Sequence, residues 1–168
     1  FVMSPLSLLL LSACSGGGGG STLISRDYEG KAVAGPLKDA IAFLDLDGNA
    51  SLDPGEPFVR TISDGSIDDG KFSFTLDDIS KITGNTSLVV KADELTIDKS
   101  SGATVEGLIL KAPETGASVV TPATTLMQES GLTSDQVKSA LKMTVDPLTY
   151  DPYEKDFSEM TEEEKSVA

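Results

Sequence analysis

The sequence has no histidine and no tryptophan, and Cys14 is the one cysteine among its 168 residues. Without histidine, the chain lacks the usual general base of a Ser–His or Cys–His pair and the nitrogen ligand common in zinc and copper sites. A single cysteine cannot build an internal disulfide framework. Metal chemistry in this chain must therefore use oxygen ligands, which favours calcium or magnesium.

Basic residues are also scarce. Lys and Arg number 13 against 27 Asp and Glu, which gives a formal net charge of −14. Such a surface repels nucleic acid and anionic lipid headgroups and attracts cations, so we expect no nucleic-acid partner. Aromatic residues make up only 5% of the chain, so aliphatic side chains and a few phenylalanines must form the core.

The first 13 residues form an apolar run that closes on small side chains. The run is too short to cross a bilayer as a helix of about 20 residues, and it suits the apolar region of a secretory signal peptide. The stretch Leu11-Ser12-Ala13-Cys14 resembles the bacterial lipobox. That resemblance implies cleavage before Cys14, acylation of its thiol and attachment to a membrane through the lipid. The alternative is that Cys14 is a small buried apolar residue.

Residues 14–29 contain five consecutive glycines and are expected to be a flexible, lipid-anchored linker. Ser15, directly after the cysteine, implies by the same resemblance an outer-membrane lipoprotein of the cell envelope, facing either the periplasm or the outside. The chain begins without a basic segment and ends in an unfinished helical pattern. We therefore expect it to be part of a longer protein.

Residues 30–112 show short alternating apolar runs separated by Gly, Asp, Asn and Pro. Strands are expected at 31–34, 40–44, 58–62, 71–76, 87–91 and 105–110, with a further short one at 95–97. Several short strands without helical periodicity predict a mainly β fold, an Ig-like or prealbumin-like β-sandwich. In KFSFTL, Phe72, Phe74 and Leu76 fall on one face of a strand and should line the core.

The pattern changes again in residues 113–168, where we expect a short α-helical segment. Thr121-Pro122 is a typical helix start, residues 123–129 continue it and Gly131 ends it. Thr133 or Ser134 caps a second helix. Residues 146–152 are expected to form a loop, and residues 161–164 open a third helix with acidic side chains in its first turn.

The most informative stretch is DLDGNASLDPGE, residues 45–56. Aligned with the calcium-binding loop of an EF-hand, its oxygen-bearing residues fall at positions 1, 3, 5, 7, 9 and 12: Asp45, Asp47, Asn49, Ser51, Asp53 and Glu56. Calcium takes six to eight oxygen ligands, and this spacing lets one curled backbone supply them, with the Ser51 carbonyl and both Glu56 oxygens included. At position 6, Ala50 replaces the usual glycine, and a left-handed alanine costs about 1–2 kcal/mol. The alternative is that Gly48 shifts the turn by two residues, which would change the ligands after Asn49.

A solvated acidic turn is the simpler interpretation of this stretch, because Asp, Asn, Gly and Pro populate turns in any case. Four carboxylates within twelve residues, however, repel one another unless a cation lies among them. Extracellular sites of this kind bind calcium with dissociation constants of about 10⁻⁴–10⁻³ M, which suits a structural role outside the cell.

The residues on both sides of the loop are β-branched and alternating, whereas an EF-hand has helices there. The run from Asp45 to Pro57, with Ala34–Ala40 before it and Asp69–Phe72 after it, resembles bacterial surface repeats of the SdrD B-like type and the wider carboxypeptidase-regulatory, prealbumin-like group. That resemblance implies a calcium-binding β-sandwich of a surface lipoprotein. By the same analogy Asp64 or Asp69 could complete the calcium shell, with a plain turn as the alternative for each.

The function expected from these features is a structural or adhesive module, lipid-anchored in the cell envelope and stabilised by calcium. Its protein or carbohydrate ligand is left open. The alternative is an accessory domain of a larger secreted hydrolase. We expect no enzyme within these residues, because adjacent acids such as Asp68 and Asp69 usually point apart on a strand or turn.

Overall fold

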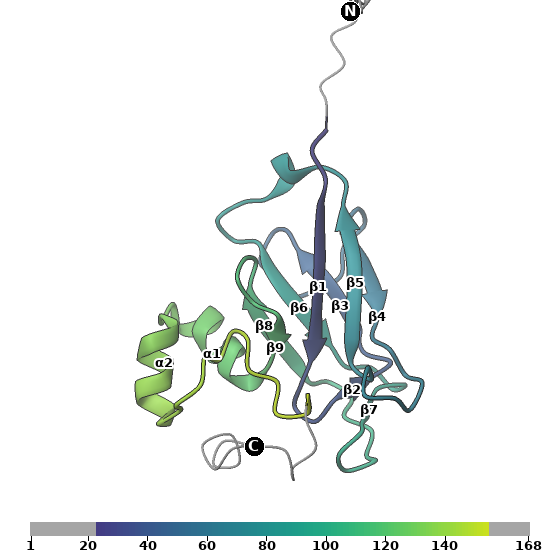
Figure 1. Ribbon diagram of the computed structural model, residues 1–168. Helices are drawn as coiled ribbons and strands as arrows, with labels where there is room; N and C mark the ends of the chain where they lie inside the picture. Colours follow the sequence, from purple (N-terminus) through teal and green to yellow (C-terminus); the bar gives the residue numbers. More distant parts are fainter. Residues whose placement is uncertain (1–22, 155–168) are drawn as a thin grey trace, which may run out of the picture.

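The computed structural model describes residues 23–154, which form two facing β-sheets followed by two short helices (Figure 1). The strands are β1 (Arg26–Ala32), β2 (Leu37–Lys38), β3 (Ile41–Asp45), β4 (Phe58–Arg60), β5 (Lys71–Leu76), β6 (Ser87–Lys91), β7 (Ile97–Asp98), β8 (Ile109–Pro113) and β9 (Val119–Val120). A 3₁₀ turn spans Ile79–Lys81, and the helices are α1 (Pro122–Ser130) and α2 (Ser134–Leu141). The prediction of a mainly β sandwich with a short helical segment is confirmed.

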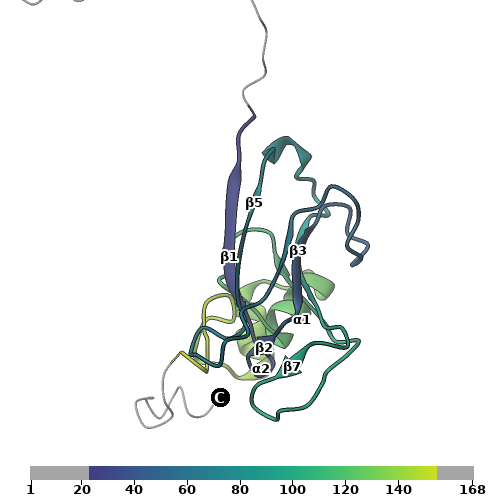
Figure 2. The same ribbon diagram turned by 90° about the vertical axis from the view of Figure 1, so that its right-hand side faces the viewer.

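One sheet has the strand order β5-β1-β9 and the other the order β4-β3-β6-β8. Figure 2 shows the two layers edge-on, with β1 and β5 in one and β3 in the other. A small ribbon of β2 and β7 lies at one end. The apolar core fills the space between the layers, because strand residues alternate between two faces. Core residues include Tyr28, Phe72, Phe74, Leu44, Val90 and Leu110.

Strand β5 shows how the sequence pattern becomes a core. Its burial alternates strictly, with Phe72, Phe74 and Leu76 facing inward, as the sequence predicts. The rings of Phe72 and Tyr28 both stack on Phe74, with centroid distances of 6.0 and 5.6 Å. These offset aromatic pairs give the small core a rigid centre.

Several strand boundaries differ from the predicted ones. Strand β1 begins at Arg26, inside the expected 14–29 linker, because Arg26–Lys31 pair with β5 along its whole length. The run at 105–110 becomes a strand only from Ile109, because Gly107 adopts a left-handed φ of 85° and turns the chain. Strands β2 and β9 were not expected, since two residues carry no readable alternation.

The first two predicted helices are present with the predicted caps. Thr121 forms a capping box with Thr124, Pro122 opens α1, and Gly131 ends it with a left-handed φ of 67°. Thr133 caps α2 in the same way. The third expected helix, at 161–164, lies outside the described residues. Of the helices described, none is long and apolar enough to cross a membrane.

The helical segment packs directly on the sandwich. Strand β9 pairs with β1, and α1 lies against β8 at the edge of the other sheet (Figure 1). Thr124 is fully buried, and its hydroxyl donates to the Lys111 carbonyl, while the Thr125 hydroxyl accepts the Lys111 N–H. The expected domain boundary after residue 112 therefore falls inside β8, and the residues up to 154 belong to the same packed body.

A buried ion pair ties the C-terminal loop to the first strand. The Lys31 ammonium lies 2.7 Å from the Asp151 carboxylate, and only 5% and 11% of these side chains are exposed. The Ser118 N–H also donates to the Leu148 carbonyl of the same loop. Two residues far apart in sequence thus hold the end of the described chain against β1.

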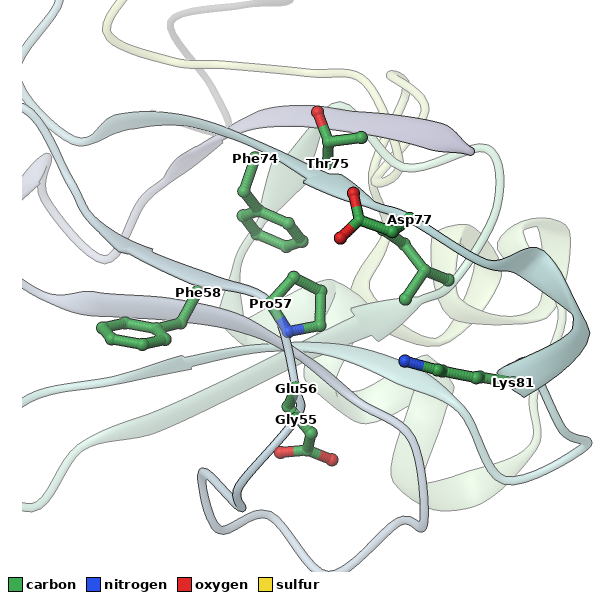
Figure 3. Close-up of a pocket in the computed structure, with 9 residues that line it drawn as sticks. Gly55, Glu56, Pro57, Phe58, Phe74, Thr75, Asp77 and Lys81 are labelled. Atoms are coloured by element: carbon green, nitrogen blue, oxygen red, sulfur yellow. The ribbon is translucent and has the colours of Figure 1, made fainter. Parts of the chain in front are cut away.

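The opposite side of the sandwich, where edge strands β4 and β5 lie, is uncovered by the helices. It contains a pocket of about 440 Å³ between Gly55–Phe58 and Phe74–Asp77, with Lys81 at its rim (Figure 3). At the other end of β4, Arg60 pairs with Asp93 and donates to the Asp39 carbonyl. The helices thus cover one side of the sandwich, whereas on the other side Ile62, just after β4, bonds Gly70 and Lys71 at the start of β5.

Replacing Asp151 with alanine should lower the free energy of unfolding by about 3 kcal/mol, because it leaves the buried Lys31 ammonium without a counter-charge. Adding Lys31→Met to the same chain should recover most of that loss. Urea unfolding measures both, with the exposed Glu94→Ala as a control that should change stability little. A double variant no more stable than Asp151→Ala would contradict this account.

The Arg60–Asp93 pair predicts a pH dependence. The Arg60 guanidinium lowers the pKa of Asp93 to about 2. Partial burial opposes this shift, and the hydrogen bond from the Leu95 N–H adds to it. A carboxyl with a depressed folded-state pKa stabilises above its unfolded pKa of about 4, and that stabilisation is lost as the pH falls toward 2. After allowance for solvent screening we expect about 1 kcal/mol. Urea unfolding at pH 5 and pH 3 should show this difference in the parent chain, and a smaller one in Asp93→Asn.

Candidate metal centre

The acidic loop joins β3 to β4 and is organised around one buried carboxylate. Asp45, the last residue of β3, has 0% of its surface exposed. Its Oδ1 accepts the N–H groups of Gly48 (2.7 Å) and Asn49 (3.2 Å), and its Oδ2 accepts that of Ala50 (2.8 Å). Three backbone donors directed at one carboxylate curl the loop around Asp45.

The first half of the loop enters the left-handed region at two residues. Gly48 does so with φ 85° and Ala50 with φ 56°. Ala50 therefore adopts the conformation that a glycine usually supplies at the sixth position, at a cost of about 1–2 kcal/mol. Its N–H donates to Asp45, and this hydrogen bond offsets part of the cost. The loop keeps the predicted turn despite the alanine.

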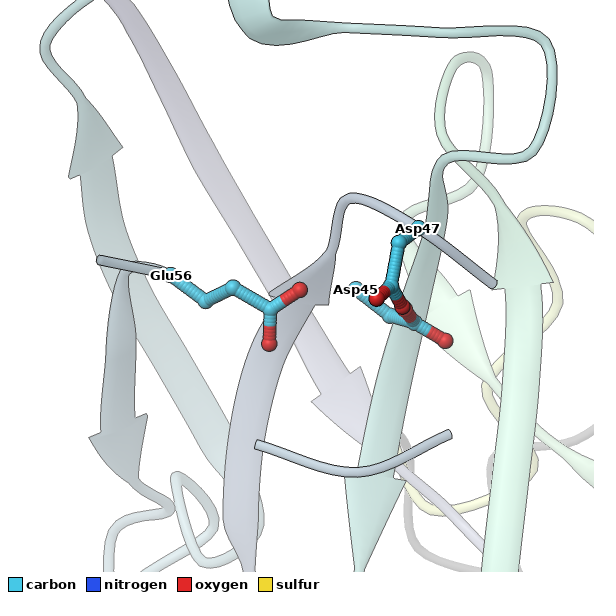
Figure 4. Close-up of side chains that lie close together, drawn as sticks. All are labelled: Asp45, Asp47 and Glu56. Atoms are coloured by element: carbon cyan, nitrogen blue, oxygen red, sulfur yellow. The ribbon is translucent and has the colours of Figure 1, made fainter. Parts of the chain in front are cut away.

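Three of the six predicted ligands come together in this loop. One carboxylate oxygen from each of Asp45, Asp47 and Glu56 lies within 4.8 Å of the other two (Figure 4). Oxygens bound to one calcium ion at 2.3–2.6 Å can be up to about 5 Å apart. A single ion placed among these three atoms is therefore compatible with their present separation.

Glu56 connects the two ends of the loop. Its Oε1 accepts the Leu46 N–H at 2.7 Å, and its Oε2 accepts the Asp53 N–H at 2.9 Å. Each carboxylate oxygen has two lone pairs, so an oxygen that accepts one N–H can still bind a cation. In Asp45 the same reasoning applies to Oδ2, which accepts the Ala50 N–H, whereas Oδ1 already accepts two N–H groups. The donor set is anionic, built of oxygen and irregular in geometry, and it fits calcium.

The other predicted ligands are arranged differently. The Asn49 amide nitrogen donates to Asp47 (3.1 Å) and to Asp53 (2.6 Å), while its oxygen accepts the Ser51 N–H at 2.6 Å. The partly positive amide group thus lies between two carboxylates, where a cation would also be attracted. Asp53 is linked to the three-carboxylate group through Asn49, and the Ser51 side chain is exposed.

Asp64 and Asp69 lie away from this cluster. Asp45 is the last residue of β3. The 64–70 loop lies near the opposite end of this strand, because Ile41, the first residue of β3, pairs with Arg60 and the Ile62 N–H donates to the Lys71 carbonyl. Oδ1 of Asp69 accepts the N–H groups of Asp64 and Gly65, both at 2.9 Å. Both residues therefore take part in the hydrogen bonds of a turn, which is the alternative expected for them.

In this second acidic loop, a lysine side chain supplies the positive charge. Lys99, from the turn after β7, places its ammonium 2.9 Å from Oδ2 of the fully buried Asp69 and donates to the Ser66 carbonyl. Burial opposes ionisation of Asp69, but Lys99 and the Gly65 and Asp64 N–H groups outweigh it, so the pKa of Asp69 is lowered. Nothing in the local sequence pattern links Lys99 to this loop, so its role could not be predicted from motifs.

No protein-family model, curated protein or solved structure matches the chain. The resemblance to bacterial surface modules therefore stays a prediction.

Replacing Lys99 with methionine should lower the free energy of unfolding by about 1–3 kcal/mol, because a buried carboxylate loses its counter-charge while the apolar stem is kept. The loss should shrink as the pH falls and Asp69 becomes protonated, since its stabilising charge is present only above its pKa. Because the pKa of Asp69 in the folded chain lies below its ordinary value of about 4, urea unfolding at pH 7 and pH 3 measures the change, with Lys138→Met as control. An equal effect in the control would argue against this role.

Proposed function

We propose that the chain is a calcium-stabilised β-sandwich module of the cell envelope, attached to a membrane by a lipid on Cys14. The observation that supports the calcium site best is the convergence of the Asp45, Asp47 and Glu56 carboxylates on one turn between two strands. Asp45 carries particular weight, because a carboxylate withdrawn completely from water needs strong compensation.

The ion would act by stiffening the β3–β4 connection. Glu56 touches the backbone at both ends of the loop, at Leu46 and at Asp53, and Asp45 holds its middle. A cation shared by these side chains removes the repulsion among them and fixes the loop against the sandwich. At a free calcium concentration a hundredfold above the dissociation constant, binding to the folded state alone contributes about 2.7 kcal/mol.

The envelope location is proposed from sequence, because Cys14 and the glycine run lie outside the described residues. The chain runs from these residues into β1, which begins at Arg26. The charge of −14 is compatible with a surface kept away from anionic headgroups by a linker. The proposed role is structural or adhesive, with no catalytic step assigned to these residues.

Calcium should raise the melting midpoint of the purified chain by roughly 5–10 °C over the same chain in chelator, because it binds only the folded state. Magnesium should have a smaller effect, since it demands near-ideal octahedral geometry. Asp47→Asn together with Glu56→Gln should abolish the calcium shift, because both substitutions remove charge and keep side-chain size. Circular dichroism melting records the midpoints.

The matched control is Asp135→Asn, which removes one carboxylate from the exposed start of α2 and should keep the full calcium shift. A parent chain with no calcium-dependent change in midpoint, or a double variant that keeps the change, would remove the ion from the proposal.

A further inference from the structure

An apolar hollow of about 460 Å³ lies where the C-terminal loop meets the helices and the end of β1. It is lined by the 33–35 turn after β1, the start of α1 at 121–123, the residues Leu141 and Met143 at the end of α2, and the loop at 147–153 (Figure 1). No charged side chain is among its lining residues, whereas Glu56, Asp77 and Lys81 line the pocket beside β4 and β5. In so highly charged a chain, this makes the hollow a distinct apolar surface.

The end of α2 leaves apolar side chains exposed beside this hollow. Val137 is fully buried, but Leu141, one helical turn further along the same face, is 48% exposed. Tyr153, on the opposite wall, is 37% exposed. Covering these side chains would remove apolar surface from water, so the hollow favours a further apolar segment.

The chain itself supplies the nearest apolar side chains. Phe157 follows Tyr153 by four residues, and Met160 follows Phe157 by three. Four residues span at most about 14 Å, so Phe157 stays close to the hollow in any conformation. A spacing of three residues also lets both side chains lie on one side of a helical turn. Such a short connection gives the segment a high effective concentration at this surface.

The size of the hollow suits these two side chains. A cavity of about 150 Å³ holds a benzene ring, so a hollow of about 460 Å³ has room for the Phe157 ring and for a second side chain. Methionine is unbranched and fills irregular apolar spaces well, which suits Met160 for the remaining part.

Charge also favours this segment. Apart from Phe157 and Met160, residues 155–168 are mostly polar, and the acids at 156, 159 and 162–164 outnumber Lys155 and Lys165. Lys142 lies between two lining residues and is exposed, and none of the ion pairs within residues 23–154 includes it. Its charge attracts these acids to the rim of the hollow while they remain in water.

We propose that residues 155–168 return to this hollow and place Phe157 and Met160 in it. The occupant is thus part of the same chain, and its docking joins α1, α2 and the 33–35 turn through one apolar contact. The contact lies beside the loop that carries Asp151, so it adds to the Lys31–Asp151 pair in holding this loop against β1.

The apolar residues 1–13 are a less suitable occupant of the hollow. Their end of the chain joins β1 at Arg26, whereas the hollow begins at Val33, after the opposite end of that strand. A segment entering at Arg26 would have to run back along the whole of β1, while Phe157 is four residues from the lining residue Tyr153.

A tryptophan probe tests the contact directly, because the natural sequence has none. In the full chain, Phe157→Trp should emit at a shorter wavelength than the control Ser166→Trp, and acrylamide should quench it several-fold less, because the ring lies in the hollow. In concentrated urea the two variants should become alike. Equal emission and quenching of the two folded variants would overturn the proposal.

A mutant cycle tests which surface Phe157 contacts. Phe157→Ala should lower the melting midpoint in chelator by roughly 3–6 °C, because it removes buried apolar contacts. In a Leu141→Ala chain, the same substitution should cost about half as much, since its partner is already truncated. Far-UV circular dichroism before melting shows that the variants fold.

The matched control for this cycle is Leu126→Ala, which truncates a similarly exposed leucine of α1 that does not line the hollow. Phe157→Ala should keep its full effect in that chain. Additive losses for Leu141 and Phe157, or no loss from Phe157→Ala, would contradict the proposed contact.

Protein concentration separates this contact from docking between two copies. The Phe157→Trp emission should be the same at low and high concentration, because the contact lies within one chain. Burial that increases with concentration, together with a dimer in sedimentation equilibrium, would assign the hollow to a second copy and overturn the proposal. All these measurements are made in chelator, so their outcome does not depend on the calcium proposal.

Discussion

A carboxylate enclosed by backbone N–H groups is the interaction on which the candidate site depends. Asp45 closes β3 and receives three N–H donors from the residues that follow it, so the direction of the loop is set before any ion is considered. Glu56 then joins the two ends of the same loop. Because these bonds are local, the site is assembled by a dozen consecutive residues, and the sandwich has only to hold the two strands at its ends.

The sequence predicts most of what is local in this protein. The alternation in KFSFTL, the helix caps at Thr121 and Thr133, and the left-handed turn at Ala50 are each encoded within a few residues, and all are present. The strand expected at 105–110 begins late because one glycine turns the chain, a local effect that periodicity does not register. Charge and spacing likewise predict Asp45, Asp47 and Glu56 as ligands of one site, and the structure places their carboxylates close together.

What the sequence could not predict is long-range pairing. Lys31 and Asp151 are ordinary charged residues in the sequence, and only the folded chain buries them together. Nothing in the sequence around Lys99 indicates that it pairs with Asp69. The two residues of β9 are too few to show the alternation of a strand. In each case the partner is fixed by topology, which depends on all the strands at once. The parallel pairing of β9 with β1 also explains why the helices are part of the sandwich.

The placement of the two chain ends gives β1 a further property. The described chain enters at Arg26, at the end of the sandwich that holds the Asp45 loop, and its last part is fastened at the opposite end, where Asp151 meets Lys31. A pulling force applied between these ends would run along β1 and act on its ladders with β5 and β9 in shear. The ladder bonds would then share the load together, instead of opening one after another as in a peeled hairpin. An arrangement of this kind resists extension.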